Sequence, residues 1–71
     1  MKKVHKPYNK LKVWLKDNGI TYADVALLLG RTETCVMHKI NGYSDFSLSE
    51  VTLMKAEYKI KDDIFFTNEV A

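Results

Sequence analysis

Apolar residues recur along this chain with the spacing of helices rather than the strict alternation of strands. One helical face of residues 8–18 carries four of them: Tyr8, Leu11, Trp14 and Leu15. Gly19 follows this run and is expected to end the helix. The helical spacing of Trp14 and Leu11 favours a place for Trp14 in the core over a role in stacking on bases.

The next run predicts a short, largely buried helix over residues 22–29. Thr21 offers a hydroxyl as N-cap, and Asp24 stands three residues later, which is the capping-box pattern. Four positions of this helix are expected to be buried: Val25, Ala26, Leu28 and Leu29. Gly30 comes directly after them, and because glycine adopts a left-handed backbone at little cost, it should end the helix.

A third helix is expected to start at Thr32, as its N-cap, and to run to about Asn41. Val36 and Ile40 are four residues apart and therefore share one face of it. Asn41 and Gly42 together can form a hairpin turn, but the flanking residues do not alternate between apolar and polar. We therefore interpret this pair as the end of the helix.

Two further helices complete the predicted fold. Ser47 and Glu50 form a second capping box, which opens a fourth helix with four inward positions: Leu48, Val51, Met54 and Tyr58. Residues 61–68 predict a short last helix with three apolar anchors: Ile64, Phe65 and Phe66. Phe65 and Phe66 cannot both face one core easily, so one is expected to seal the core while the other packs on the arm or on the first helix. The alternative is that these three anchors form a dimer contact. The expected fold class is all-α, with five short helices.

Length and composition predict one cytoplasmic domain. The chain has 71 residues and one cysteine, Cys35, which excludes an internal disulfide and fits a reducing compartment. No apolar run approaches the roughly 20 residues that cross a bilayer, and none follows the basic start as in a signal peptide. We therefore expect no membrane contact.

Charge is distributed unevenly. Residues 1–16 contain six lysines and no acidic residue, a charge of +6, whereas residues 17–71 contain five basic and nine acidic residues, a charge of −4. The basic start is typical either of a solvated tail or of a segment that binds a polyanion.

The sequence does not favour metal or catalytic chemistry. Cys35 and His38 have a spacing that suits a metal, but a zinc site needs about four ligands, and His5 is the only other histidine or cysteine. The carboxylates are scattered, and there is no glycine-rich phosphate loop. We expect no enzyme activity, no cofactor and no small-molecule substrate.

Ala26, Gly30 and Val36 have a spacing that indicates two helices packed at a steep angle. Such a pair needs a small residue where the backbones approach, a glycine in the turn and an apolar side chain from the second helix in the shared core. These residues meet the three needs in order. The arrangement is a helix-turn-helix, which leaves the outer face of its second helix free to enter the major groove of DNA.

The segment from Asn18 to Val51 resembles the lambda-repressor-like, Cro/C1-type helix-turn-helix family. The resemblance rests on the opening "GIT" at residues 19–21, the "NG" at 41–42 and the "SLSE" at 47–50, and it covers residues 8–66. It implies a five-helix domain that binds operator DNA, usually as a homodimer, and has no catalysis. Small phage or prophage regulators have a similar length. The implied organisation is a basic arm at residues 1–7, a DNA-binding domain at 8–67 and a tail at 68–71.

The resemblance also implies roles for individual residues. The positions that reach bases, on a recognition helix of about residues 33–41, are Glu33, Thr34, Met37 and His38. The positions that contact phosphates are Tyr22, Arg31, Lys39, Asn41, Tyr43 and Ser44, and the basic arm adds Lys2, Lys3 and Lys6. The positions that hold the helix-turn-helix together are Ala26, Gly30, Val36 and Ile40.

Three residues depart from the family pattern. Tyr22 stands where relatives often have glutamine, Lys39 stands where they are often apolar, and Glu33 is acidic on a surface that should meet a polyanion. Glu33 can accept a hydrogen bond from cytosine N4, but it repels phosphates. The leading prediction is a sequence-specific transcription regulator. The alternative is a protein-interaction module, antirepressor-like or partner-binding, on the same fold.

Overall fold

The fold is all-α over residues 2–65, which are the residues that the computed structural model describes. Four α-helices follow one another along the chain: α1 (Asn9–Asp17), α2 (Tyr22–Leu29), α3 (Glu33–Asn41) and α4 (Leu48–Tyr58). A short 3-10 helix, η1 (Asp62–Phe65), comes last, and this part of the chain contains no strand. None of these helices is long and apolar enough to cross a membrane.

Local capping signals set the helix boundaries. The hydroxyl of Thr21 accepts from the Asp24 amide at 3.1 Å, and the Asp24 carboxylate accepts from the Thr21 amide at 2.9 Å, so the first predicted capping box is confirmed. Ser47 and Glu50 form the second in the same way. The predicted N-cap of α3 is also confirmed. Gly30 ends α2 with φ 66°, in the left-handed region.

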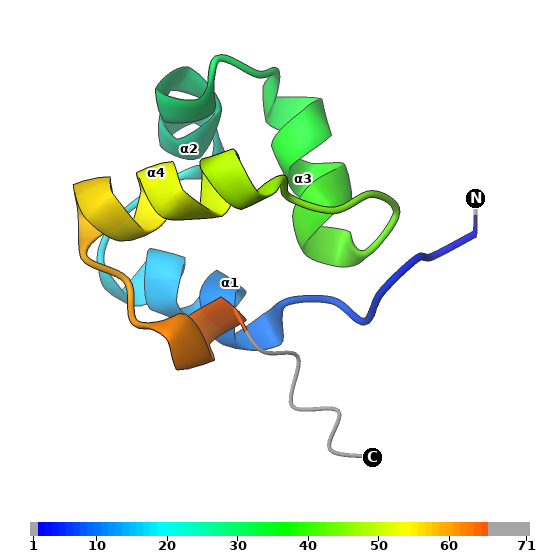
Figure 1. Cartoon of the computed structure of the whole chain (residues 1–71), viewed down its shortest axis with the longest axis horizontal. Helices are drawn as coiled ribbons and strands as arrows, with labels where there is room; N and C mark the ends of the chain where they lie inside the picture. The colour runs from blue at the N-terminus through cyan, green and yellow to red at the C-terminus, as the bar shows by residue number, and fades with distance from the viewer. Residues whose placement is uncertain (1, 66–71) are drawn as a thin grey trace.

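The helices enclose one apolar core, with α2 packed on α3 and α4, and α1 packed on α3 and η1 (Figure 1). Nine apolar residues are buried in it: Leu11, Leu15, Val25, Ala26, Val36, Ile40, Phe46, Met54 and Ile60. Trp14 is partly buried and packs against this core. The small side chain of Ala26 lies where α2 packs on the rest of the molecule, and it is only 5% exposed.

One expectation about the second half of the chain is wrong. Leu48 was expected to face inward but is 83% exposed, because the buried face of α4 runs through Glu50 and Met54. Leu48 precedes Glu50 by two residues, which is roughly 200° around the helix. The predicted short last helix, over residues 61–68, is present as the 3-10 helix η1, and its remaining residues 66–68 lie outside the described part of the chain. Lys59 ends α4 in a left-handed conformation, and Ile60, between α4 and η1 in the sequence, is buried.

Candidate nucleic-acid interface

The outer face of α3 carries the four residues that were predicted to contact bases. Val36 and Ile40 are completely buried and fix the inner face of the helix. The other side of the helix carries three exposed residues, Glu33, Thr34 and Met37. His38, on the same side, is partly buried. Thr32 holds the N-terminus of α3 by accepting from the Cys35 amide at 3.1 Å. The predicted base contacts therefore share one surface that has no part in the core.

The C-terminus of α3 is closed by the loop of residues 42–47. The His38 carbonyl accepts from the amides of Gly42 and Tyr43, at 3.1 and 2.9 Å. The His38 ring meets the Tyr43 ring edge-on, with 5.8 Å between their centroids. Asn41, Tyr43 and Ser44 are each partly buried here. The loop thus continues the surface formed by the outer face of α3.

The basic arm lies against this loop. The amide of Val4 donates to the Gly42 carbonyl at 2.6 Å. The His5 ring places Nε2 2.7 Å from the Ser44 carbonyl and stacks on Tyr8. The Lys3 ammonium lies 5.6 Å from the centre of the Tyr43 ring, within cation–π range. Lys2, Lys3 and Lys6 are all exposed, so their charges lie beside the C-terminal end of α3.

Gly42 is required by this packing. Its φ of 103° lies in the left-handed region, and an added Cβ atom would collide with the His5 carbonyl oxygen. A side chain at position 42 would therefore displace the arm. The pair Asn41–Gly42 both ends α3 and makes room for the N-terminal segment.

Lys39 and Arg31, two of the predicted phosphate contacts, both pair with Glu50. The Lys39 ammonium is buried and donates to Glu50 Oε1 at 2.6 Å. Arg31 Nε donates to Glu50 Oε2 at 3.0 Å, but 53% of the Arg31 side chain is exposed. Arg31 can still reach an anion at the surface. The Lys39 ammonium cannot, because it is buried against the Glu50 carboxylate of α4.

Glu50 is the centre of this charged cluster. Burial alone would raise the pKa of Glu50, but hydrogen bonds from the Lys39 ammonium, the Ser47 amide and the Arg31 guanidinium outweigh it and lower the pKa to about 2. The carboxylate joins the α2–α3 turn, the inner side of α3 and the start of α4. It therefore ties α3 to the α2–α3 turn and to the start of α4.

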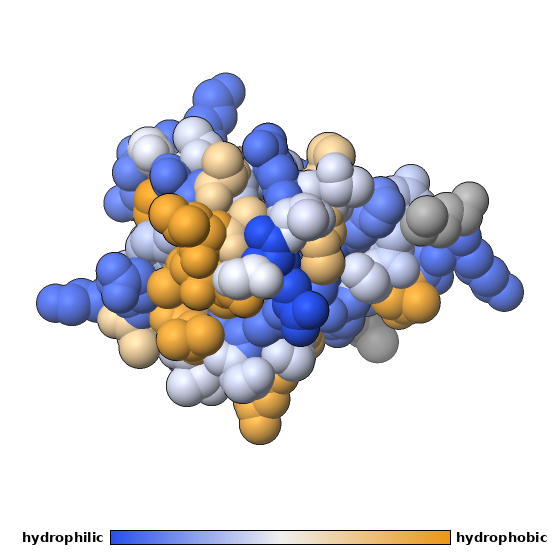
Figure 2. Space-filling model, turned by 90° about the horizontal axis from the view of Figure 1, so that it is seen from above, coloured by the Kyte–Doolittle hydropathy of each residue, from blue (hydrophilic) through white to orange (hydrophobic). Residues whose placement is uncertain are grey.

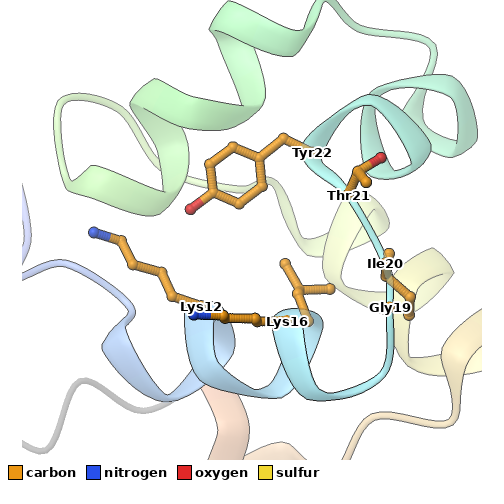
Figure 3. A pocket seen from close by; sticks show the side chains of 7 residues that line it. Lys12, Lys16, Gly19, Ile20, Thr21 and Tyr22 are labelled. Atoms are coloured by element: carbon orange, nitrogen blue, oxygen red, sulfur yellow. The ribbon is translucent and has the colours of Figure 1, made fainter.

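A hollow between α1 and α2 holds cationic groups to which the sequence gave no role. It has a volume of about 470 Å³ and is lined by Lys12 and Lys16 of α1 and by Tyr22 of α2, together with four other residues: Leu15, Gly19, Ile20 and Thr21. The Tyr22 ring reaches from α2 toward the Lys12 side chain, between α1 and α3 (Figure 3). The lining contains no carboxylate among the residues described. The missed signal is that Lys12 and Lys16 are four residues apart and share a face.

The Tyr22 hydroxyl is a neutral donor at physiological pH, as an unperturbed tyrosine is, and burial raises its pKa further. Two ammonium groups and one hydroxyl donor around a hollow suit an anion with several oxygens, such as a phosphate. The predicted role of Tyr22 as a phosphate contact stays a prediction, now with two lysines beside it.

Two residues of the predicted dimer contact, Ile64 and Phe65, lie in different surroundings. Phe65 packs edge-on against Tyr8 and Phe46, with centroids 6.5 and 6.4 Å away, so it closes the core. Ile64 instead lines an open apolar hollow together with Val13 and Trp14. Phe66 and the tail at 68–71 lie outside the described residues.

Within residues 2–65, no group of three or more histidine, cysteine, aspartate or glutamate side chains is placed to hold a metal ion. Comparisons of the chain with models of protein families, with curated proteins and with solved structures found no match. The arrangement of side chains around α3 is therefore the observation on which a function has to rest.

Proposed function

We propose that this protein is a sequence-specific DNA-binding transcription regulator of phage or prophage type, with a lambda-repressor-like helix-turn-helix domain. In this proposal α2, the connection at residues 30–32 and α3 form the helix-turn-helix, and α3 enters the major groove. The supporting observation is an outward face of α3 with no role in the core, bordered by basic and hydrogen-bonding groups from other segments.

Each side chain on that face suits one kind of base contact. Thr34 and His38 can hydrogen-bond to base edges, and Met37, which is 40% exposed, can pack on a thymine methyl group. Glu33 can accept from a cytosine N4 amine. Because the face bears one carboxylate and no lysine or arginine, affinity must come mainly from neighbouring segments, while these four residues supply discrimination.

Phosphate contacts are proposed on both sides of α3. One group consists of Lys2, Lys3 and Lys6 of the arm with Asn41, Tyr43 and Ser44 of the loop. The other consists of Tyr22, Lys12 and Lys16, with Arg31 at the α2–α3 turn. Lys39 is left out because its ammonium is buried against Glu50. Each lysine that neutralises a phosphate adds about 0.9 to the slope of log affinity against log salt concentration.

We also propose that two copies bind a roughly palindromic operator, because one small domain reads few base pairs. The candidate dimer contact is the hollow lined by the exposed Val13 and the partly buried Trp14 and Ile64. Sedimentation of the free protein and of its DNA complex tests this. One protomer per DNA site, with monomers at high concentration, would contradict it.

The second candidate function is that of a protein-interaction module without DNA reading, which the exposed Glu33 and the charge of −4 beyond residue 16 favour. Selection from a random pool of double-stranded DNA separates the two functions. The DNA-binding proposal predicts an enriched motif that is shared by most selected sequences. Recovery of unrelated sequences, at a yield no higher than without protein, would favour the interaction module.

A further inference from the structure

A second surface on the molecule is apolar and lies away from α3. A groove of about 360 Å³ runs between α2 and the C-terminal end of α4, and six residues line it: Ile20, Asp24, Leu27, Leu28, Glu57 and Tyr58. Leu27 is 85% exposed at its edge. In Figure 2 apolar side chains gather on the left of the molecule, which is the side of α2 and of the end of α4 in Figure 1.

The apolar strip continues along α4. Leu53 is 47% exposed and stands four residues before Glu57, so both lie on the same side of that helix. Leu27 lines the groove and Leu53 extends the apolar surface beyond it on the neighbouring helix. Exposed leucines on two neighbouring helices are the features with which proteins bind an amphipathic helix. The groove is open to solvent, which suits a peptide segment better than a small molecule that needs enclosure.

The charged side chains that line this groove are acidic. Asp24 and Glu57 are the two charged residues in its lining as described, and both are acidic. Both carboxylates lie near the Tyr58 hydroxyl: burial raises the pKa of Tyr58, and the charges of Asp24 and Glu57 raise it further. The groove therefore repels the DNA backbone and anionic lipid headgroups and attracts basic side chains.

We propose that the groove between α2 and α4 binds an amphipathic helix of a partner protein, with its leucine-like face against Leu27, Leu28 and Leu53 and its lysines or arginines beside Asp24 and Glu57. The C-terminal end of α4 lies on the side of the molecule opposite α3 (Figure 1). A partner bound there leaves the outer face of α3 free. This proposal does not rest on the function proposed above.

The test uses a labelled synthetic peptide of about 18 residues, long enough to form a helix, with leucines at helical spacing and lysines beside them. A second peptide keeps the leucines and replaces the lysines with glutamates, and a third keeps the lysines and replaces the leucines with serines. Fluorescence anisotropy gives the affinities, and amide NMR shifts locate the contact. We expect the first peptide to bind at least about tenfold more tightly than either other peptide.

Variants of the full chain then assign the site. Leu27→Ser and Glu57→Lys should each weaken binding of the first peptide by about fivefold or more. Leu48→Ser is the matched control, because Leu48 is 83% exposed but does not line the groove, and it should bind like the parent. Circular dichroism checks that each variant is folded, and Leu27→Ser opens no cavity because its side chain is at the surface.

Four results would overturn the proposal. The peptides with and without lysines bind equally, no peptide binds, or Leu48→Ser weakens binding as much as Leu27→Ser does. A fourth is that the parent is a dimer by sedimentation and Leu27→Ser makes it a monomer. The occupant would then be a second copy of this chain rather than a partner helix.

Discussion

Replacing Glu50 by glutamine should destabilise this domain more than any other change of a single charge described above. The substitution keeps the shape of the side chain but removes its charge, and it leaves the Lys39 ammonium buried without its counter-ion. Removing one partner of a buried pair typically costs about 3–5 kcal/mol, because the remaining charge is uncompensated.

The pKa of Glu50 gives an independent estimate of the same quantity. Lowering this pKa from 4.5 to about 2 corresponds to roughly 3 kcal/mol of stability, at about 1.4 kcal/mol per pH unit. A domain of 71 residues has a total stability of about 4–11 kcal/mol. Glu50→Gln should therefore remove between a third and most of the free energy of unfolding.

The pH dependence follows from the direction of the shift. The folded carboxyl has the lower pKa, so the contribution of Glu50 is complete above about pH 4.5 and is lost as the pH falls toward about 2. Urea unfolding of the parent and of Glu50→Gln, followed by circular dichroism at several pH values, measures it. The difference between the two proteins should be largest near neutral pH and should shrink below pH 4.5.

Two further variants make the test decisive. Glu57→Gln removes an exposed carboxylate from the same helix and should change the stability by less than about 0.5 kcal/mol. Adding Lys39→Met to Glu50→Gln removes the uncompensated ammonium and should recover part of the loss. Equal stability of Glu50→Gln and Glu57→Gln at neutral pH, or no recovery in the double variant, would refute the reasoning.

Three other changes test the packing and the proposed contacts. Gly42→Ala should lower the free energy of unfolding in urea by at least about 2 kcal/mol, and amide NMR spectra should show that the arm is released. Gly30→Ala should cost only about 1 kcal/mol, because Gly30 has the left-handed backbone but no close neighbour. Equal costs of the two substitutions would contradict this reasoning. Ala26→Leu should lower stability by about 1–3 kcal/mol through overpacking, and an unchanged thermal melt would contradict it. Replacing Lys12 and Lys16 together by glutamine should reduce the slope of log DNA affinity against log salt by up to about 1.8 with no change in preferred sequence; an unchanged slope would remove them from the phosphate contacts.

The sequence predicted the helix boundaries because their signals are local. Thr21, Ser47 and their partners three residues later satisfy the amides of their own helix, so neighbouring residues alone decide where α2 and α4 begin. Gly30 is a signal of the same kind. The inner face of α3 was also predictable, because Val36 and Ile40 are apolar and one turn apart.

The errors come from contacts between distant residues. Apolar spacing placed Leu48 inside, but a charged residue, Glu50, sets the buried face of α4, and its burial depends on Lys39, eleven residues away. The packing of the arm could not be predicted either, because nothing local shows that His5 meets Ser44, 39 residues later. Polar groups that pair across the fold cannot be distinguished in the sequence from polar groups that face solvent.

The most direct test of DNA reading by α3 compares binding to a selected operator and to a scrambled sequence over a series of salt concentrations. We expect the parent to prefer the operator by about a thousandfold or more. Thr34→Ala should lose about 1–3 kcal/mol of discrimination at one base pair while keeping the salt slope, and Thr52→Ala, an exposed threonine on α4, should behave like the parent. Equal affinity of the parent for both DNAs at every salt concentration would contradict the proposal.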